Sequence, residues 1–312
     1  MIHRLRNFDL LNFFMVDRIW PHLRARIDVL RNLFTPVDLE VRACRQFKDS
    51  HNGHRCFIVG NGASLRLVDM TRLAQETVFT VNRFHYHQHR WGIHPFCHVL
   101  IDPDYFNYVA APKYEVVKHL VSLPLKTHLF FPVQYLGVLE SLFGAPLPPR
   151  IHFLAQYATF ETNPNLDISR PIPGFQTVTL SAITVALYMG FSKIYLVGCD
   201  LDFLSDVASV SPLMLRERHF YDEAQGLIVR EHNYDYLGYC QAVCRMLQGY
   251  QFFRERVRPP QKIVNAGAGG MLDMFERVEF ASLFKGQASL DSGITSTTGK
   301  TSPRWQPTEH GT

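Results

Sequence analysis

Seven short apolar runs, spread over residues 56–267 and separated by segments with helical patterning, constrain the fold more than any other feature. The runs are rich in β-branched and aromatic residues, which favour β-strands. Because helical segments separate several of them, successive strands can lie parallel with helices on both faces of the sheet. The pattern predicts an α/β protein with a Rossmann-like, mostly parallel sheet. The expected strands are CFIVG (56–60), VFTVN (78–82), FCHVLID (96–102), THLFFP (127–132), RIHFL (150–154), KIYLVGCD (193–200) and KIVNAG (262–267).

The chain divides into a helical start, the sheet domain and a tail. Residues 1–50 carry apolar positions at helical spacing among arginines, which predicts amphipathic helices. These helices either pack on the main domain or lie with a basic face on an anionic membrane surface. The sheet domain is expected over 51–285, with a lid-like insertion at about 203–235. Residues 286–312 have the composition of a disordered tail.

Composition narrows the class of protein. A formal net charge of +4 over 312 residues does not call for nucleic acid, so no nucleic-acid partner is expected. Six cysteines are scattered without a CxxC pair, which indicates reduced thiols in a cytosolic protein. The apolar start is interrupted by acidic residues and predicts neither an export signal nor a membrane span.

The first expected strand runs into Gly60-Asn61-Gly62, and a helix is expected directly after this turn. A glycine-rich turn at that place can point backbone amides at a phosphate, and the Ser64 hydroxyl can add to them. The full GxGxxG motif is absent because position 65 is Leu. A nucleotide site and a plain tight turn both remain open.

Polar residues also follow other strands. Asn82 comes after the second strand and Asp102 after the third, and the carboxyl ends of parallel strands are where such sheets bind ligands. Asn82 then either contacts a base or ribose or caps a turn. Thr177 and Thr179 begin an expected helix, where amides and hydroxyls can bind a phosphate or carboxylate. Asp200 follows the sixth strand.

Asp200-Leu201-Asp202 superficially resembles the DxD metal motif of sugar-nucleotide transferases, but we predict no metal site. The histidines between residues 85 and 98 lack cysteine or acidic partners at ligand spacing, which favours a polar edge over a metal site.

The lid-like insertion carries the candidate catalytic residues His219, Tyr221 and His232. A histidine is the usual general base for a hydroxyl nucleophile, and a tyrosine can donate to a leaving phosphate. A surface loop can also hold these residues by chance.

In order along residues 55–285, the motifs IVGNGASL, VNRF, LIDPDYF, VALYMGFSKIYLVGCDLDF and KIVNAGAGGMLDMF resemble those of the bacterial sialyltransferases of glycosyltransferase family 42. They also resemble related hydroxymethylpterin pyrophosphokinase-like proteins of unassigned activity. The resemblance implies a modified GT-A type domain with a lid, an inverting reaction, a CMP-sugar donor, and neither a metal nor a further cofactor. It implies that Asn61 and Asn82 help to hold CMP and that Tyr221 binds the leaving phosphate. The family's catalytic histidine matches His232 best, with His219 as its rival.

Three departures from the family bear on the donor. Asp102 replaces an asparagine, Phe203-Leu204 stand where a tyrosine is expected, and FQTVTL (175–180) replaces an Arg-x-Thr-Ser-Gly helix start. A donor carboxylate would need other partners here.

The expected function is therefore transfer of an acidic sugar, sialic acid or a related nonulosonate, from a CMP-sugar to a cell-surface glycan or glycolipid. The expected location is the cytoplasm. Peripheral contact with the inner membrane and assembly into a homo-oligomer both remain open. One alternative is a Mg²⁺-dependent, ATP-using pyrophosphokinase-like transferase that binds its metal through Asp102, Asp200 and Asp202. The other is a non-catalytic nucleotide-binding protein of surface-polysaccharide synthesis.

Overall fold

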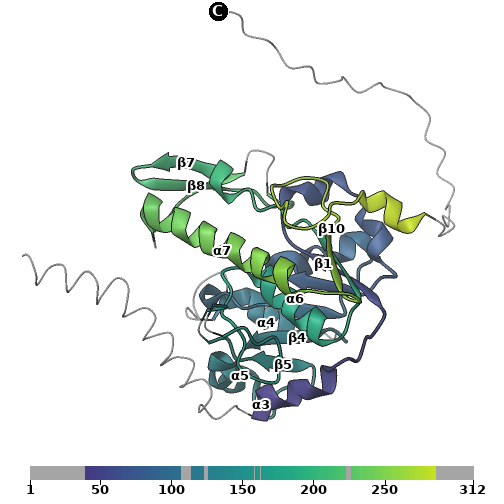
Figure 1. The fold of residues 1–312 in the computed structure, drawn as a ribbon. Coiled ribbons are helices and arrows are strands. Elements are labelled where there is room, and N and C mark those ends of the chain that lie inside the picture. Colours follow the sequence, from purple (N-terminus) through teal and green to yellow (C-terminus); the bar gives the residue numbers. More distant parts are fainter. Residues whose placement is uncertain are drawn as a thin grey trace, which may run out of the picture.

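The structure, a computed structural model, describes residues 39–106, 114–122, 126–157, 159–161, 163–222, 226–232 and 234–285. The helices expected before residue 39 and the tail expected from 286 lie outside these ranges. The described chain forms one large sheet with helices on both faces and a small second sheet beside it (Figure 1).

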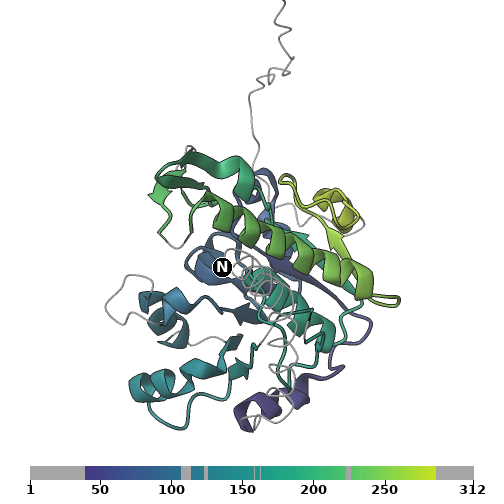
Figure 2. The same ribbon diagram turned by 60° about the vertical axis from the view of Figure 1, so that its left-hand side comes forward.

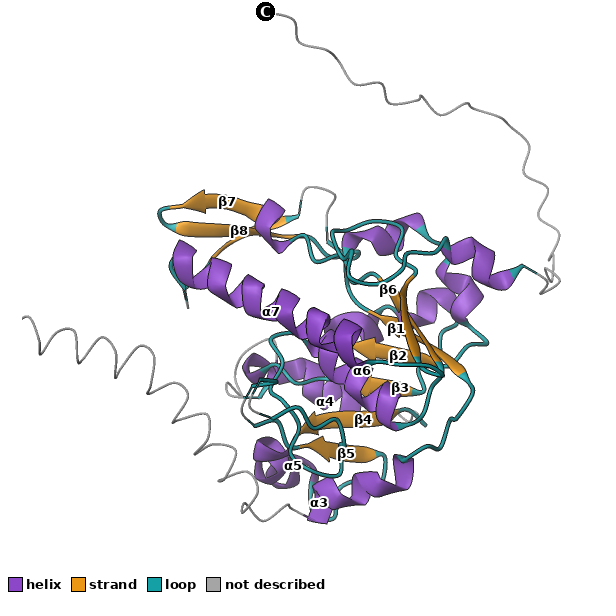
Figure 3. Cartoon of the chain, in the orientation of Figure 1, coloured by secondary structure: helices purple, strands orange, loops and turns teal. Residues whose placement is uncertain are grey.

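The large sheet has seven strands in the order β10-β6-β1-β2-β3-β4-β5, and every pairing in it is parallel (Figure 3). Each strand coincides with one of the seven expected runs, so the predicted α/β class and parallel sheet are confirmed. The strands are β1 (Arg55–Val59), β2 (Val78–Val81), β3 (Cys97–Val99), β4 (His128–Pro132), β5 (Ile151–Leu154), β6 (Lys193–Val197) and β10 (Lys262–Asn265).

The strand order reverses beside β1. The chain first builds outward from β1 to β5, and then crosses to the other side of β1 to add β6 and β10. In sheets of this kind, ligands bind outside the carboxyl ends of the strands at that reversal. The topology therefore directs attention to the ends of β1 and β6.

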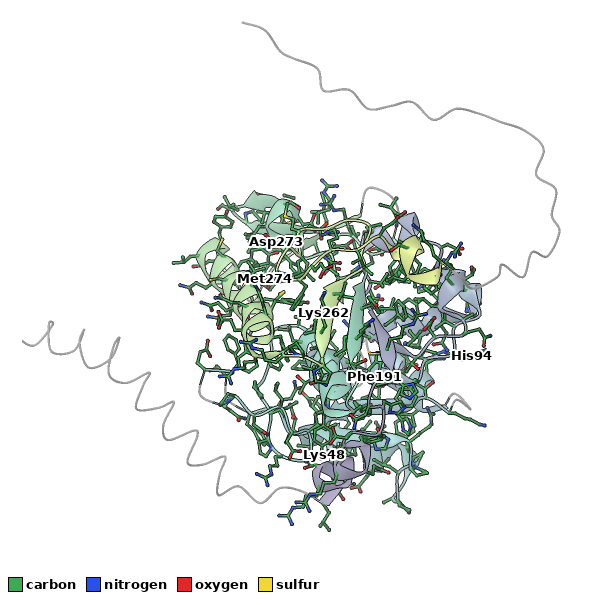
Figure 4. The ribbon with its side chains drawn as sticks, turned by 45° about the vertical axis from the view of Figure 1, so that its right-hand side comes forward. Lys48, His94, Phe191, Lys262, Asp273 and Met274 are labelled. Atoms are coloured by element: carbon green, nitrogen blue, oxygen red, sulfur yellow. The ribbon has the colours of Figure 1, made fainter. Side chains whose placement is uncertain are left out.

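One face of the sheet is covered by α6 (Val178–Tyr188), with α7 (Tyr236–Arg256) lying across it (Figures 1 and 2). Every residue of α6 is buried, because the sheet lies on one side of it and α7 on the other. Gly249 permits the close crossing, since a Cβ there would lie 2.6 Å from a methyl carbon of Leu180. Phe191, after α6, is in the packed interior, whereas His94 lies at the margin (Figure 4).

The opposite face has two kinds of cover. Two α-helices, α4 (Tyr114–Ser122) and α5 (Leu136–Phe143), pack with β4 and β5. Over β1, β2 and β6 the chain instead forms short 3-10 helices. These are η3 (Ala63–Leu67), η4 (Met70–Leu73), η5 (Asn82–Tyr86), η6 (Gln88–Trp91) and η10 (Phe280–Phe284).

The α-helix expected after Gly60-Asn61-Gly62 is thus wrong. Val68 is extended, with φ −123° and ψ 148°, and ends η3 after five residues. The Asp69 carboxylate then accepts a hydrogen bond from the Thr71 amide and caps η4. A local side-chain cap competes with helix propagation, which explains two short turns in place of one helix.

Residues 39–47 form α3 (Leu39–Arg42) and η2 (Ala43–Phe47), and both belong to the sheet domain. Val41, Cys44 and Phe47 are buried in its core, with Phe47 against the rings of Phe130 and His152. The described residues before position 51 therefore pack on the sheet domain and complete its core. The remaining 3-10 helices are η7 (Pro103–Tyr105), η8 (Val133–Tyr135) and η9 (Phe203–Asp206).

The expected lid is a small antiparallel sheet of β7 (Val207–Val210), β8 (Leu213–Glu217) and β9 (Leu227–Arg230). It projects beside the first half of α7 (Figure 2). Leu213 holds it there by packing with Tyr239 and Val243 of α7. Among the described helices, none is long and apolar enough to cross a membrane.

Candidate functional site

The Gly60-Asn61-Gly62 turn is held by the neighbouring strand β6. The amides of Gly60 and Gly62 donate to the carbonyls of Val197 and Gly198, each at 2.9 Å. A Cβ on Gly60 would lie 2.3 Å from the Gly198 oxygen. The amides of Gly60 and Gly62 are therefore not free to bind an anion in this structure, because protein carbonyls already accept from them. The glycines permit a close approach of two chain segments.

Ser64 and Asp200 bind each other across the same reversal. The Asp200 carboxylate accepts from the amide of Ser64, at 2.9 Å, and from its hydroxyl. Burial raises the pKa of the Asp200 carboxyl, and the two hydrogen bonds from Ser64 oppose that shift. In this structure both residues bind each other rather than pointing at a ligand.

Two asparagine oxygens at the ends of β1 and β2 have no partner in the described part of the chain. The Asn61 amide nitrogen donates to the Val81 carbonyl at 3.1 Å, while Oδ1 of Asn61 and Oδ1 of Asn82 are buried without a hydrogen bond. Asn82 also has a left-handed backbone, with φ 51°, an uncommon conformation that functional sites often retain. A buried polar atom without a partner is costly, and each of these two oxygens has the capacity to accept a hydrogen bond from a ligand.

Part of the lid docks directly on this turn. The Phe220 amide donates to the Asn61 carbonyl at 3.0 Å, and His219 forms an isolated antiparallel bridge with Gly62. The Phe220 ring is buried against Phe84 and Trp91. Lid residues 219–222 therefore lie at the end of β1, which borders the reversal of strand order, and beside the segment that follows β2.

His219 and Asp222 form a hydrogen-bonded pair in that docked segment. Nδ1 of His219 lies 2.7 Å from Oδ2 of Asp222, and the His219 amide donates to the same oxygen at 2.9 Å. An ionised carboxylate on Nδ1 holds the proton there and leaves Nε2 as the acceptor. His219 thus has the arrangement of a general base oriented by a carboxylate.

Tyr221 contacts two imidazoles. Its ring stacks on His219 and on His87 of the η5–η6 connection, with both centroid distances 4.9 Å. Burial raises the pKa of the Tyr221 hydroxyl, with a further increase from nearby Tyr105 and a decrease from Arg83. A protonated phenol at neutral pH can donate a hydrogen bond.

Arg83 and Asp102 complete the polar group at the ends of β2 and β3. Burial raises the pKa of Tyr105 to about 12, while the Arg83 charge lowers it and the Asp102 charge raises it. Oδ1 of Asp102 accepts from the Asp104 amide at 3.0 Å and caps η7. Asp102 therefore keeps the capping role, and Arg83 supplies a positive charge close to both tyrosines.

The other predicted site residues lie in different surroundings. His232 is exposed after β9. Thr177 and Thr179 hydrogen-bond the hydroxyl of Tyr250, which is 1% exposed on α7. The two threonines join α6 to α7, and the structure does not bring them together with the lid.

The histidines expected to form a polar edge are partly internal, so that expectation is wrong for His85 and His98. Both are buried, and burial lowers the pKa of each, to about 4 for His85. Nδ1 of His98 pairs with the Thr80 hydroxyl at 2.8 Å and Nδ1 of His85 with the Asn82 carbonyl at 3.0 Å. Among the described residues, no three His, Cys, Asp or Glu side chains are grouped so that they could hold a metal.

Comparison with known families agrees with this description of the fold. A family model described as "MptE-like: 6-hydroxymethylpterin diphosphokinase MptE-like" matches residues 29–206, more than half of the chain. The chain belongs to the MptE-like family. The sequence resemblance to hydroxymethylpterin pyrophosphokinase-like proteins is thereby confirmed. No curated protein is significantly similar to this MptE-like chain.

Two solved structures are similar in fold. One is a MAf glycosyltransferase from Magnetospirillum magneticum AMB-1, with 17% identity, a TM-score of 0.44 and 79% of this chain covered. The match spans only 39% of that glycosyltransferase. The other is the sialyltransferase CstII from Campylobacter jejuni in complex with a substrate analogue, cytidine-5'-monophosphate. Its identity is 17% and its TM-score 0.42, with 73% of this chain and 85% of that one covered. With identities and TM-scores this low, neither similarity is evidence about the activity of this chain.

Sequence reasoning assigned no role in the site to Asp222 or His87. Asp222 could have been found from the sequence, because an acidic residue three positions after a lid histidine can fold back on that histidine in a turn. His87 had no such signal, since only the docking of the lid brings it beside Tyr221.

Proposed function

We propose that this MptE-like chain is a group transferase that takes a nucleotide-activated donor at the ends of β1 and β2. His219 acts as the general base that activates an acceptor hydroxyl. The observation that carries the proposal is the His219–Asp222 pair, which docks at the end of β1 beside the unpartnered side-chain oxygens of Asn61 and Asn82.

The chemistry follows from what each side chain can hold or donate. Nε2 of His219 takes the proton of the acceptor hydroxyl as the hydroxyl oxygen attacks the donor, and Asp222 stabilises the imidazolium that forms. The Tyr221 hydroxyl donates to the departing phosphate, which leaves without an acid because it is already stable as an anion. His219 replaces His232 as the preferred base, since His232 is exposed after β9.

The finer proposal is that the donor is a CMP-activated acidic sugar and the acceptor a cell-surface glycan or glycolipid. It is supported by the order of sequence motifs over residues 55–285. Oδ1 of Asn61 and of Asn82 can accept from ribose hydroxyls or a base amine, and Arg83 offers a positive charge for the carboxylate or phosphate of the donor.

The second candidate, favoured by the family description, is transfer of diphosphate from ATP with Mg²⁺. The carboxylates expected to bind Mg²⁺, those of Asp102, Asp200 and Asp202, form no metal-holding group among the described residues. Both oxygens of Asp200 already accept hydrogen bonds from Ser64. A metal ion at Asp200 would therefore compete with Ser64 for the carboxylate oxygens.

The first test is binding. Thermal unfolding is followed with CMP and with ATP, each in EDTA and in Mg²⁺. A nucleotide present at 100 times its Kd should stabilise the fold by about 2.7 kcal/mol. Stabilisation by CMP in EDTA supports the sugar-transfer proposal, and stabilisation by ATP only with Mg²⁺ overturns it in favour of the diphosphokinase.

The second test is turnover of the nucleotide that binds, with His219→Gln and a matched His232→Gln control. Loss of a general base should lower kcat about 10²- to 10⁴-fold in the first variant. The second variant should keep wild-type turnover, because His232 is exposed after β9. Loss of turnover in His232→Gln alone would assign the general base to His232. Full activity in both variants would mean that neither lid histidine is the base.

A further inference from the structure

Lid residues 219–222 form a closed turn whose carbonyl oxygens meet one arginine. The Asp222 amide donates to the His219 carbonyl at 3.2 Å and closes the turn. Nε of Arg66 donates to the Phe220 carbonyl at 2.9 Å. Nη2 of Arg66 donates to the carbonyls of His219, at 2.9 Å, and of Asp222. A single guanidinium thus contacts three carbonyls of a four-residue turn.

Arg66 is well placed to link the two parts of the site. It belongs to η3, which begins directly after Gly60-Asn61-Gly62, so its backbone is fixed to the end of β1. Its side chain reaches a lid segment more than 150 residues later in the sequence. A planar guanidinium carries several donors in fixed directions, and hydrogen bonds from a charged donor are stronger than neutral ones.

We propose that Arg66 is a positioning residue for His219. The guanidinium holds the 219–222 turn closed on the end of β1, and the closed turn brings the Asp222 carboxylate onto Nδ1 of His219. Arg66 itself touches no reacting atom. The catalytic part of this inference rests on the proposed function, whereas the closing of the turn does not.

Substitutions at Arg66 separate geometry from charge. Arg66→Met keeps most of the side-chain length and removes every donor. Arg66→Lys keeps the charge but supplies a point donor that cannot reach three carbonyls in the fork geometry. The matched control is Arg72→Gln in the next 3-10 helix, where the arginine pairs with Asp69 at the surface and is partly exposed.

Hydrogen exchange tests the turn without any need for activity. The Phe220 and Asp222 amides are hydrogen-bonded in the docked turn, and their exchange reports its opening. In Arg66→Met we expect these amides to exchange at least about tenfold faster, while amides of β1 and β6 keep wild-type protection. Arg66→Lys should fall between Arg66→Met and wild type, and Arg72→Gln should match wild type. Unchanged exchange at Phe220 and Asp222 in Arg66→Met overturns the proposal even if the protein has no transferase activity.

Kinetics test the link to His219. Small misplacement of a catalytic group lowers turnover steeply, so we expect kcat of Arg66→Met to fall about 10- to 100-fold with KM for the donor little changed. If Arg66 acts through the His219–Asp222 pair, Arg66→Met should cost little further activity once Asp222→Asn is present. Additive losses, or a rise of activity in Arg66→Met, would show that Arg66 acts elsewhere or holds the lid shut against substrate. If the wild-type protein shows no turnover, the proposed function is refuted. Hydrogen exchange alone then tests whether Arg66 holds the 219–222 turn closed.

Discussion

At the scale of single residues, Gly60 has a packing role. Its amide is bonded to β6, and a Cβ would lie 2.3 Å from the Gly198 carbonyl oxygen, which belongs to the backbone and cannot rotate away. Overpacking of this kind typically costs about 1–3 kcal/mol. We expect Gly60→Ala to lower the free energy of unfolding in urea by that amount.

Gly137 provides the matched control for this substitution. It lies near the start of α5, and a Cβ there would meet no atom within 4 Å. Gly137→Ala should be neutral or stabilise the protein by up to about 1 kcal/mol, because alanine favours the helix. Equal stability of the two variants would mean that β6 can move away from the Gly60-Asn61-Gly62 turn.

The same turn shows what the sequence could and could not predict about the site. The placement of Asn61 and Asn82 at one edge of the sheet could be predicted, because polar residues directly after the strands of a parallel sheet lie at its carboxyl edge. The pairing of Ser64 with Asp200, and of Arg66 with the lid turn, joins residues more than 130 positions apart. No local pattern carries those contacts, so only the fold could reveal them.

At the scale of elements, prediction succeeded where burial is uniform. The seven parallel strands are buried on both faces, and continuous apolar runs identify them. The lid strands β7 and β9 consist of exposed and half-buried residues, and the sequence predicted only a lid there. The 3-10 helices were not distinguished from α-helices, because the difference depends on local caps such as Asp69.

The lid sheet should open independently of the rest. Its attachment to α7 depends on a small cluster centred on Leu213, apart from the main core. Removing a buried leucine side chain typically costs about 2–5 kcal/mol, and here the loss falls on the lid alone. We expect Leu213→Ala to speed tryptic cleavage after Arg216, Arg218 and Arg230 at least about tenfold, with an unchanged urea midpoint.

Leu227→Ala on β9 is the control, because this leucine is 60% exposed and its truncation removes little packing. It should be cleaved like the wild type. If Leu213→Ala lowers the urea midpoint as much as it speeds cleavage, the lid and the parallel sheet unfold together and the independence is refuted.

At the scale of the whole molecule, stability should depend on buried neutral histidines. Burial lowers the pKa of His152 to about 3 and of His85 to about 4, and lowers that of His98 well below its usual range. The usual pKa of about 6.5 applies to the unfolded chain. Between these values the unfolded chain binds protons that the folded chain does not, so stability is full above about pH 6.5 and is lost as pH falls. Each such histidine should contribute about 1.4 kcal/mol per pH unit to that loss.

His152→Phe tests this dependence while keeping an aromatic ring against Phe47 and Phe130. Urea unfolding of wild type between pH 6 and pH 5 should show a steep decrease of the unfolding free energy. The variant should show a slope shallower by about one proton, or about 1.4 kcal/mol per pH unit. The exposed His94, replaced by Asn, should leave the slope unchanged. Equal slopes in His152→Phe and wild type would mean that His152 becomes protonated within the folded protein, and the acid sensitivity would then have to come from other groups such as His85, His98 and His128.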